Sequence, residues 1–288
     1  MAQVFDCFPF FNELDLLEIR LHEHGPFVDR FVIAESTETF SGEPKPLHFE
    51  ANRDRFAAFA DRITYIVVDD TPPERRSRWG REQYQRDVLG RGLTDAAAED
   101  LVILSDVDEI MRGEAIRSAK AAPPERFEIL CFELRMYNYY LNYEAEERWL
   151  RSGPRAVRAK DLTSLWALRR TKGPTGAPFR DFTRSLYNWR ELGRPVRSRV
   201  IRDAGWHFTY LGSTAEIQTK IRARAGSDST KPILDPAVLE ERIRSGRVSN
   251  AWYDSLLTYR PLDSSFPAFL LANRQRFAHL LMPPPAAQ

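Results

Sequence analysis

The segment whose residue types most clearly suggest chemistry is LVILSDVDEI, in which an apolar run ends at Asp106 and Asp108. Alternate residues of a strand share one face, so these two carboxylates are expected to project the same way where the strand ends. Two carboxylates held together need a cation or hydrogen bonds to offset their repulsion and desolvation. Oxygen ligands of this kind suit Mg²⁺ or Mn²⁺, with water and phosphate oxygens completing the shell. The alternative is a solvated turn after a strand.

Three side chains of one expected helix form a second candidate site. Trp79, Glu82 and Arg86 are spaced three and four residues apart and therefore share a face. They either line a ligand site or form a surface ion pair beside a packed tryptophan. His207 follows Trp206 in an aromatic segment, where it is either a third metal ligand or a hydrogen-bonded core histidine.

The late part of the chain is rich in cations, which either lie on solvated faces or pair with a diphosphate. Lys220 and Arg224 are four residues apart and share one face of an expected helix, which fits both interpretations. The aromatic run at 136–143, with Trp149 and Trp166, either stacks on sugar rings or packs in the core. The other cations of interest are Arg169, Arg170, Lys172, Arg180 and Arg222.

The elements that must position these residues alternate in type through the first half of the chain. Apolar runs predict buried strands, and the segments between them carry apolar residues at helical spacing. Strand–helix–strand units repeated in this way indicate an α/β fold with a mainly parallel sheet. The expected strands are 4–11, 28–36, 62–70, 99–110 and 126–141, and the expected helices are 12–24, 53–60, 78–93 and 113–122.

The second half of the chain is less regular. Residues 143–200 are expected to form short strands and loops, and 204–213 an aromatic strand. Helices are expected at 215–225, 236–246 and 266–281, before a disordered tail at 283–288. Ligands bind beyond the carboxyl ends of strands in open parallel sheets, so three strand exits are candidates. They are Asn12–Glu13, Glu35–Ser36 and Asp106–Asp108.

Composition limits the classes of partner. The 288 residues carry 42 Lys and Arg and 41 Asp and Glu, a net charge of 42 − 41 = +1, so nothing favours nucleic acid or an anionic membrane electrostatically. No run of eighteen apolar residues predicts a transmembrane helix, although peripheral contact with a membrane stays open. Cys7 and Cys131 lie in apolar runs, as buried thiols do, and no basic leader precedes them. We therefore expect a cytoplasmic protein.

Five segments, taken in order, resemble glycosyltransferase family 17, a family of N-acetylglucosaminyltransferases with many bacterial members. The resemblance implies a GT-A-like α/β fold that binds a nucleotide sugar, with a mainly parallel central sheet flanked by helices. It implies one catalytic domain, 1–282, with a nucleotide-binding half, 1–142, and an acceptor-side half with the C-terminal helices, 143–282. The five segments are FDCFPFFNELDLLEIRL (5–21), FVIAESTETFSGEPKPLHF (31–49), SDVDEI (105–110), AGWHFTYLG (204–212) and FLLANRQRFAHLL (269–281).

The resemblance also implies a reaction: inverting transfer of N-acetylglucosamine from UDP-GlcNAc to a hydroxyl of a glycan acceptor, with a β-1,4 linkage and Mn²⁺ or Mg²⁺. Asp106 then lies near the ribose and the metal, and Asp108 is the main metal ligand. His207 returns to the metal or the diphosphate. The residues expected around the donor are Asn12, Glu13, Glu35, Glu82, Arg86, Asp106 and Lys220.

Such a displacement needs a carboxylate that accepts the proton of the acceptor hydroxyl. Glu109, Glu133 and Asp181 are candidates, and the sequence does not choose among them. The alternative is a non-catalytic nucleotide-sugar- or glycan-binding protein, which would keep a groove formed by the aromatic residues of 136–143, Trp149 and Trp166. A haloacid-dehalogenase-like phosphatase uses the first Asp of an Asp-x-Asp motif as nucleophile. That motif belongs on an early strand, whereas here it follows three others.

Overall fold

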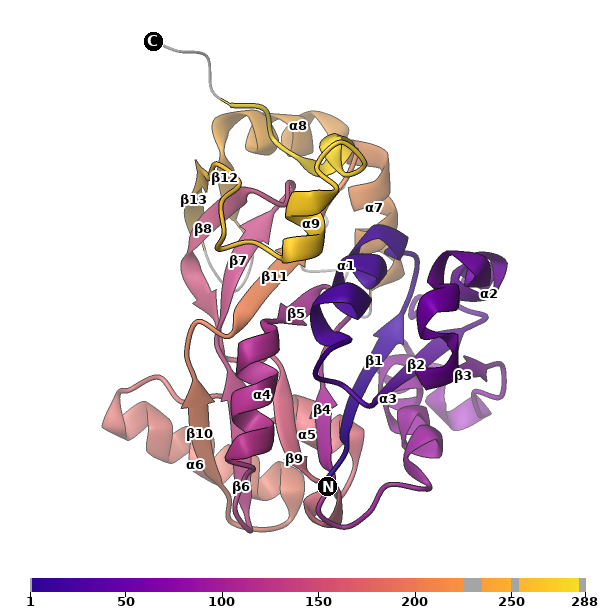
Figure 1. The fold of residues 1–288 in the computed structure, drawn as a ribbon, viewed down its shortest axis with the longest axis vertical. Helices are drawn as coiled ribbons and strands as arrows, with labels where there is room; N and C mark the ends of the chain where they lie inside the picture. The colour runs from indigo at the N-terminus through magenta and orange to yellow at the C-terminus, as the bar shows by residue number, and fades with distance from the viewer. Residues whose placement is uncertain (1, 225–234, 250–253, 285–288) are drawn as a thin grey trace.

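The strands of this protein form two sheets, one above the other in Figure 1. The computed structural model describes residues 2–224, 235–249 and 254–284. Within these ranges the lower sheet has seven strands and the upper sheet has six. Three stretches of chain pass from the lower sheet into the upper one, which joins the two sheets into one body.

The lower sheet contains the strands expected from the early apolar runs. Its bounds are β1 Val4–Phe10, β2 Arg30–Ser36, β3 Ile63–Val68, β4 Leu101–Leu104, β6 Glu128–Phe132, β9 Arg155–Arg158 and β10 Arg197–Ile201. β4, β1, β2 and β3 are neighbours in that order and run parallel. β9 runs antiparallel between β4 and β6, and β10 pairs with β6 in parallel. The expected α/β fold with a mainly parallel central sheet is confirmed.

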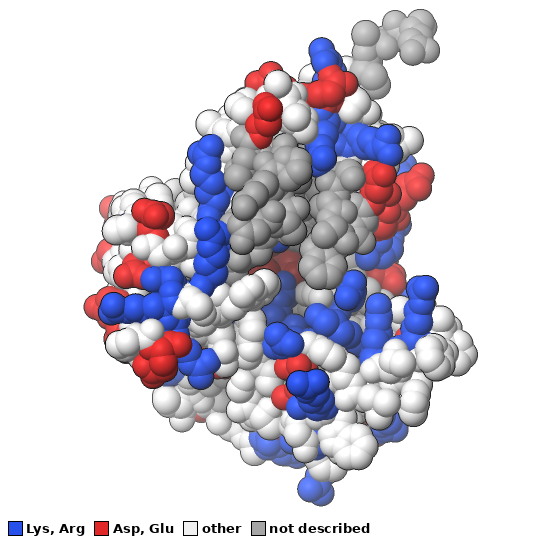
Figure 2. Space-filling model, turned by 180° about the vertical axis from the view of Figure 1, so that it is seen from behind, with Lys and Arg blue, Asp and Glu red and all other residues white. Residues whose placement is uncertain are grey.

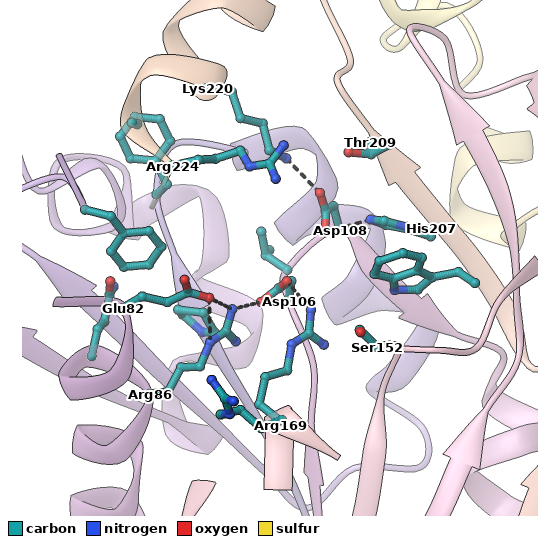
Figure 3. A pocket seen from close by; sticks show the side chains of 18 of the residues that line it. Glu82, Arg86, Asp106, Asp108, Ser152, Arg169, His207, Thr209, Lys220 and Arg224 are labelled. Atoms are coloured by element: carbon teal, nitrogen blue, oxygen red, sulfur yellow. Dashed lines mark hydrogen bonds and ion pairs between the residues drawn. The ribbon is translucent and has the colours of Figure 1, made fainter. Parts of the chain in front are cut away.

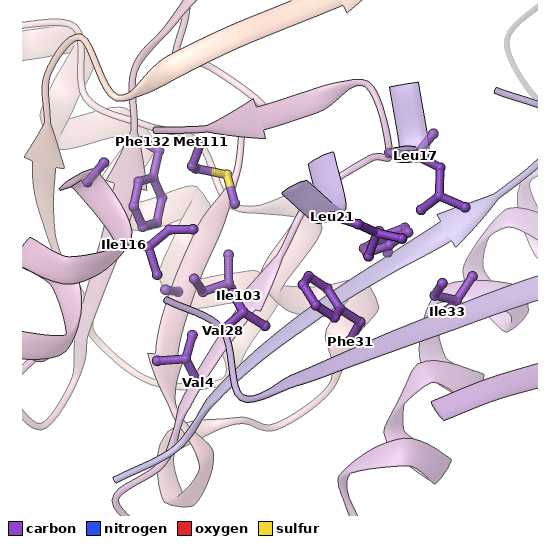
Figure 4. Close-up of a cluster of buried hydrophobic side chains, with 14 of the residues drawn as sticks. Val4, Leu17, Leu21, Val28, Phe31, Ile33, Ile103, Met111, Ile116 and Phe132 are labelled. Atoms are coloured by element: carbon purple, nitrogen blue, oxygen red, sulfur yellow. The ribbon is translucent and has the colours of Figure 1, made fainter. Parts of the chain in front are cut away.

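Both faces of this sheet are buried, which explains why its strands are continuous apolar runs. Val4 and Phe8 of β1 point to one face, where they pack with helices α1 (Leu14–His24) and α4 (Gly113–Ala121). Figure 4 shows part of this cluster. Phe5 and Cys7 point to the other face and pack with residues of α3 (Arg78–Val88) and α5 (Leu165–Arg170). The helices expected to flank the sheet are therefore present on both faces.

The upper sheet was not expected from the sequence. Its strands are mostly antiparallel. The predicted strand 126–141 is two strands, β6 in the lower sheet and β7 in the upper, so a single strand was wrong. At Glu133 the backbone bonds to Ile201 and Ala204, where the chain changes sheet. The bounds are β12 Arg247–Ser249, β13 Asp254–Tyr259, β8 Tyr143–Trp149, β7 Leu134–Asn138, β11 Gly205–Thr209 and β5 Glu109–Met111.

Two predictions about helices also differ from the structure. Residues 143–200 hold two helices that were expected as strands and loops, α5 and α6 (Pro178–Leu192). The helix expected at 53–60 is present as a 3-10 helix, Arg53–Arg62. The expected helix 266–281 is a short α9 (Ala268–Ala272) followed by turns and the 3-10 helix Ala278–Leu280. The remaining helices are α2 His48–Ala51, α7 Thr214–Ala223 and α8 Pro236–Ser245.

The boundary expected at residue 142 does not coincide with the division between the sheets. β9 and β10 come from the second half of the chain and complete the lower sheet, while β5 and β7 come from the first half and belong to the upper one. Cys7 and Cys131 are both buried and unpaired. No helix in the part of the chain that the structure describes is long and apolar enough to span a membrane.

Candidate active site

A cavity of about 910 Å³ opens beyond the carboxyl ends of β1 and β4. β1 pairs with β2 on one side and with β4 on the other, so the chain order reverses at β1. Such switch points are where open α/β sheets bind ligands. Phe10 ends β1, and Asp106 and Asp108 follow β4; all three line the cavity. Figure 2 shows Lys and Arg side chains gathered around a hollow near the middle of this face.

Asp106 is held by two arginines from different helices (Figure 3). Its carboxylate lies 2.7 Å from Nη2 of Arg86 on α3 and 2.5 Å from Nη2 of Arg169 on α5. Desolvation alone raises the pKa of this carboxyl, but the two guanidinium groups outweigh it and hold the pKa below its usual value. The expected pair of Glu82 with Arg86 is present at 3.1 Å, so the predicted helix face does point into the site.

Glu109 is buried and its carboxylate is fully occupied. It accepts hydrogen bonds from the Trp149 indole at 2.5 Å, from Arg169 at 2.8 Å and from the backbone N–H of Asp106 at 2.8 Å. These bonds position Arg169 and the turn that carries Asp106. A carboxylate so occupied is poorly placed to accept a further proton, so the structure favours a positioning role for Glu109 over that of base.

The turn is also held from below by Arg20 of α1, which the sequence did not single out. Arg20 is fully buried and donates to the Asp6 carboxylate and to the Ser105 hydroxyl at 2.5 Å. It also donates to the backbone carbonyls of Asp106 at 2.9 Å and Glu109 at 2.8 Å. The sequence signals its burial only through the apolar neighbours Leu16, Leu17, Ile19 and Leu21.

Asp108 faces two side chains from the late part of the chain. Its Oδ2 accepts from Nζ of Lys220 on α7 at 2.7 Å, and its Oδ1 lies 3.6 Å from Nε2 of His207 on β11. Burial raises the pKa of Asp108, but Lys220 and His207 outweigh it and lower that pKa below its usual value. Lys220 also contacts Glu13 at 2.9 Å, and the two carboxylates raise its pKa despite burial.

Two of the three predicted metal ligands, Asp108 and His207, face each other in the cavity. The gap of 3.6 Å between Asp108 and His207 is wider than a hydrogen bond, as is usual for two ligands of one ion. Both aspartates already contact cationic side chains: Asp106 contacts Arg86 and Arg169, and Asp108 contacts Lys220. Among the described residues no group of three His, Cys, Asp or Glu side chains is placed to hold a metal. Other ligands would have to come from water or from a bound phosphate.

One carboxylate of the cavity differs from all the others. Glu147, on β8, has a buried Oε2 with no hydrogen-bond partner, and no ion pair is recorded for it with any described residue. It shares a strand face with Trp149, whose ring lies 4.8 Å from that of His207. Nothing in the sequence distinguishes Glu147 from the other acids of the chain. The other cavity carboxylates each pair with a Lys or Arg: Glu13, Glu38, Glu82, Asp106 and Asp108.

Cations without carboxylate partners line the wall of the cavity formed by α5 and α6. The hydrogen bond recorded for Nζ of Lys172 goes to the Ser152 hydroxyl at 3.3 Å. Arg184 donates a hydrogen bond to the backbone carbonyl of Gly173. Burial and four neighbouring arginines lower the pKa of Lys172 to about 8. This wall has the charge and donors to bind an anionic group such as phosphate.

Five predicted site residues are not among those that line the cavity: Glu109, described above, Glu133, Asp181, Asn12 and Glu35. Glu133 pairs with Arg202 at 3.0 Å, and Asp181 accepts hydrogen bonds from Thr175 and Gly176 at the start of α6. Neither of these two acids lies in the cavity, where the base would have to act. Two other predicted site residues, Asn12 and Glu35, also lie outside the cavity lining.

Glu35 has a supporting position instead. It is fully buried and accepts hydrogen bonds from Lys45 at 2.8 Å, from the Tyr65 hydroxyl at 2.9 Å and from the backbone N–H groups of His48 and Phe49. These bonds hold the 37–49 loop over the sheet. Lys45 itself lines the cavity, so Glu35 contributes to the site by holding Lys45 in place.

Comparisons with known proteins agree with this chemistry. The model of glycosyltransferase family 17 matches residues 1–168. The beta-1,4-mannosyl-glycoprotein 4-beta-N-acetylglucosaminyltransferase of Rattus norvegicus is 28% identical over an alignment of 305 positions. This alignment covers 95% of this chain and 53% of that protein. The protein of the same name from Homo sapiens is 28% identical, with 94% and 53% covered. The chain thus spans about half the length of these curated relatives.

Solved structures are similar only at a low level. A mycobacterial protein is 12% identical with a TM-score of 0.41, covering 94% of this chain and 88% of that one. The 4-diphosphocytidyl-2C-methyl-D-erythritol synthase of Anaerococcus prevotii is 10% identical with a TM-score of 0.35, covering 70% and 87%. These scores support no conclusion about this chain. The family model, in contrast, covers more than half of this chain, and the chain therefore belongs to glycosyltransferase family 17.

Proposed function

We propose that this protein transfers N-acetylglucosamine from UDP-GlcNAc to a sugar hydroxyl of a glycan, with inversion and a β-1,4 linkage. The observation that carries the proposal is the cavity at the carboxyl ends of β1 and β4, which contains Asp106 and Asp108 in a member of family 17. The donor and the linkage come from the relatives' names, at 28% identity. The phosphatase alternative does not agree with the family.

The donor's diphosphate is proposed to lie between Asp108 and two cations, Lys220 of α7 and Arg224 directly after this helix. Lys220 and Arg224 both line the cavity there (Figure 3). Asp108 and His207 would hold a divalent cation, which when bound neutralises charge on the departing diphosphate. Lys220 supplies positive charge at the same point, because two carboxylates keep it protonated. The same cavity is lined by Asp106 and by the two arginines that contact it, Arg86 and Arg169.

We further propose Glu147 as the general base. In a single displacement its carboxylate takes the proton of the acceptor hydroxyl while that oxygen attacks the anomeric carbon. The bond from the anomeric carbon to the diphosphate breaks, and UDP leaves with the bonding electron pair. Glu147 is favoured over Glu109 because its Oε2 has no hydrogen bond, whereas both Glu109 oxygens are occupied.

Calorimetric titration with UDP-GlcNAc, UDP-glucose and UDP-galactose, with and without Mn²⁺, tests the donor and the cation site together. We expect UDP-GlcNAc to bind tightest and Mn²⁺ to strengthen its binding. Asp108→Asn is expected to remove most of the Mn²⁺ effect. Binding of UDP-GlcNAc without any release of UDP in an assay of donor turnover supports a non-catalytic binding protein. Absence of binding to all three nucleotide sugars contradicts the proposal.

A further inference from the structure

Helix α6 carries a stripe of exposed apolar side chains. Phe179, Phe182, Leu186 and Trp189 are 80%, 62%, 47% and 49% exposed. Their spacing of three, four and three residues places them on one side of the helix. Exposed apolar side chains gathered in this way mark an interaction surface, whereas single ones are ordinary. In Figure 1 the helix lies at the lower edge of the molecule.

The opposite side of α6 holds the helix in place. Asn188 and Leu192 are buried, and the Asn188 side chain exchanges hydrogen bonds with the backbone of Lys172 at 2.7 and 3.0 Å. Thr183, Arg184 and Tyr187 line the cavity of the active site. The helix is therefore anchored through its inner side, and its outer side has no packing partner among the described residues.

The charged side chains of α6 that have no recorded ion pair are positive. Arg180 and Arg190 are exposed, and no ion pair is recorded for either within the described part of the chain. Both acids of the helix are engaged, Asp181 by the backbone of Thr175 and Gly176 and Glu191 by Arg170 at 2.9 Å. A helix that exposes aromatic and aliphatic side chains together with arginines that have no recorded ion pair suits the interface of an anionic lipid bilayer. A protein partner for an apolar stripe needs no such charges.

We propose that the outer side of α6, defined by Phe179, Phe182, Leu186 and Trp189, docks the enzyme on an anionic membrane surface. The apolar side chains enter the lipid interface, and Arg180 and Arg190 contact lipid phosphates. Because the inner side of the same helix lines the cavity, docking holds the active site close to the membrane. A glycan acceptor carried by a lipid is then within reach; this consequence rests on the proposed function.

Vesicle flotation with the full chain tests the docking without any turnover. We compare vesicles of phosphatidylglycerol and phosphatidylcholine in equal parts with vesicles of phosphatidylcholine alone. The wild-type protein is expected to float with the anionic vesicles, and Phe179→Ser/Phe182→Ser to lower its affinity at least about 10-fold. Arg180→Gln and Arg190→Gln are each expected to lower it about fivefold, and added salt to remove the difference. Leu256→Ser is the matched control, because Leu256 of β13 is 63% exposed.

Three results overturn the proposal. They are equal flotation of the wild type with and without anionic lipid, unchanged affinity of the double variant, and an effect of Leu256→Ser as large as that of the double variant. A wild-type dimer in sedimentation that the double variant turns into a monomer, without vesicle binding, assigns the stripe to a second copy instead. The double variant should bind UDP-GlcNAc as the wild type does, so failure of the donor titration concerns the proposed function alone.

Discussion

Glu146 and Glu147 are neighbours in β8 and point to opposite sides of the strand. Glu146 is exposed, while Glu147 lines the cavity with an unpartnered buried oxygen. They form a natural pair for testing the base at the scale of one residue. If Glu147 takes the acceptor proton, only one of two chemically identical substitutions affects the chemistry.

We expect Glu147→Gln to lower kcat for sugar transfer by about 10²–10⁴, because glutamine cannot accept the proton. Its affinity for UDP-GlcNAc in the calorimetric titration should be unchanged. The acidic limb of the pH profile of kcat/KM should disappear with it, a change that a merely structural role does not cause. Glu146→Gln should leave both quantities at the wild-type value. A Glu147→Gln enzyme with more than about a tenth of wild-type kcat excludes this residue as the base.

At the scale of one element, helix α1 is joined to β1 and β5 by a buried histidine. Nδ1 of His24 lies 2.8 Å from the Asp6 carboxylate, and its Nε2 accepts from the backbone N–H of Met111 at 3.0 Å. This pattern requires the neutral ring, since a protonated Nε2 cannot accept. Burial lowers the pKa of His24 despite the Asp6 charge. Burial raises the pKa of Asp6, but Arg20 and His24 outweigh it and lower that pKa to about 2.

Both shifts make the folded state less stable in acid. As the pH falls below 6.5, His24 takes up a proton in the unfolded state before it does so in the folded state. Below pH 3.8 the same holds for Asp6. The free energy of unfolding should therefore decrease on acidification, with Asp6 contributing about 2 kcal/mol between pH 4 and 2. Urea denaturation at a series of pH values measures this. His24→Gln should be less stable at pH 7 and should show a flatter curve between pH 7 and 5; an equally steep curve assigns the effect to other groups.

On the scale of the whole molecule, the C-terminal segment packs against parts of the chain far from it in sequence. Phe277 is fully buried in a cluster with Ile19 of α1, Tyr137 of β7 and Phe208 of β11. His22 of α1 stacks on Phe269 with ring centroids 3.7 Å apart. These contacts tie the upper sheet to a helix that also covers the lower one. The two sheets should consequently unfold together.

Phe277→Ala is expected to lower the free energy of unfolding by about 3–5 kcal/mol, because it leaves a cavity at the centre of this cluster. Circular dichroism and tryptophan fluorescence should still report one coincident transition for the variant. Phe179→Ala is the control, since its side chain is 80% exposed and the change should stay within about 0.5 kcal/mol. Two separate transitions would show that the sheets are independent folding units.

Local patterns in the sequence determined the parallel strands β1 to β4 of the lower sheet and the Asp-x-Asp motif that follows β4. Strands buried on both faces must be apolar throughout, so β1, β2 and β4 are legible as runs. The rule that ligands bind at the carboxyl ends of such strands placed Asp106 and Asp108 at the site before any contact was known. The spacing on α3 likewise aimed Glu82 and Arg86 at it, because helix periodicity is itself local.

Tertiary structure alone decided which charges meet and which remain free. Arg169 pairs with Asp106 across 63 residues and Lys220 with Asp108 across 112, and no local pattern records such pairings. The same holds for Glu147, which is distinguished from Glu109 only by the absence of a partner. The net charge of +1 gives no sign of the two arginines of α6, Arg180 and Arg190, that have no recorded ion pair. Composition sums charge over the whole surface, whereas a ligand or a membrane senses only the charges that the fold brings within a few ångströms of it.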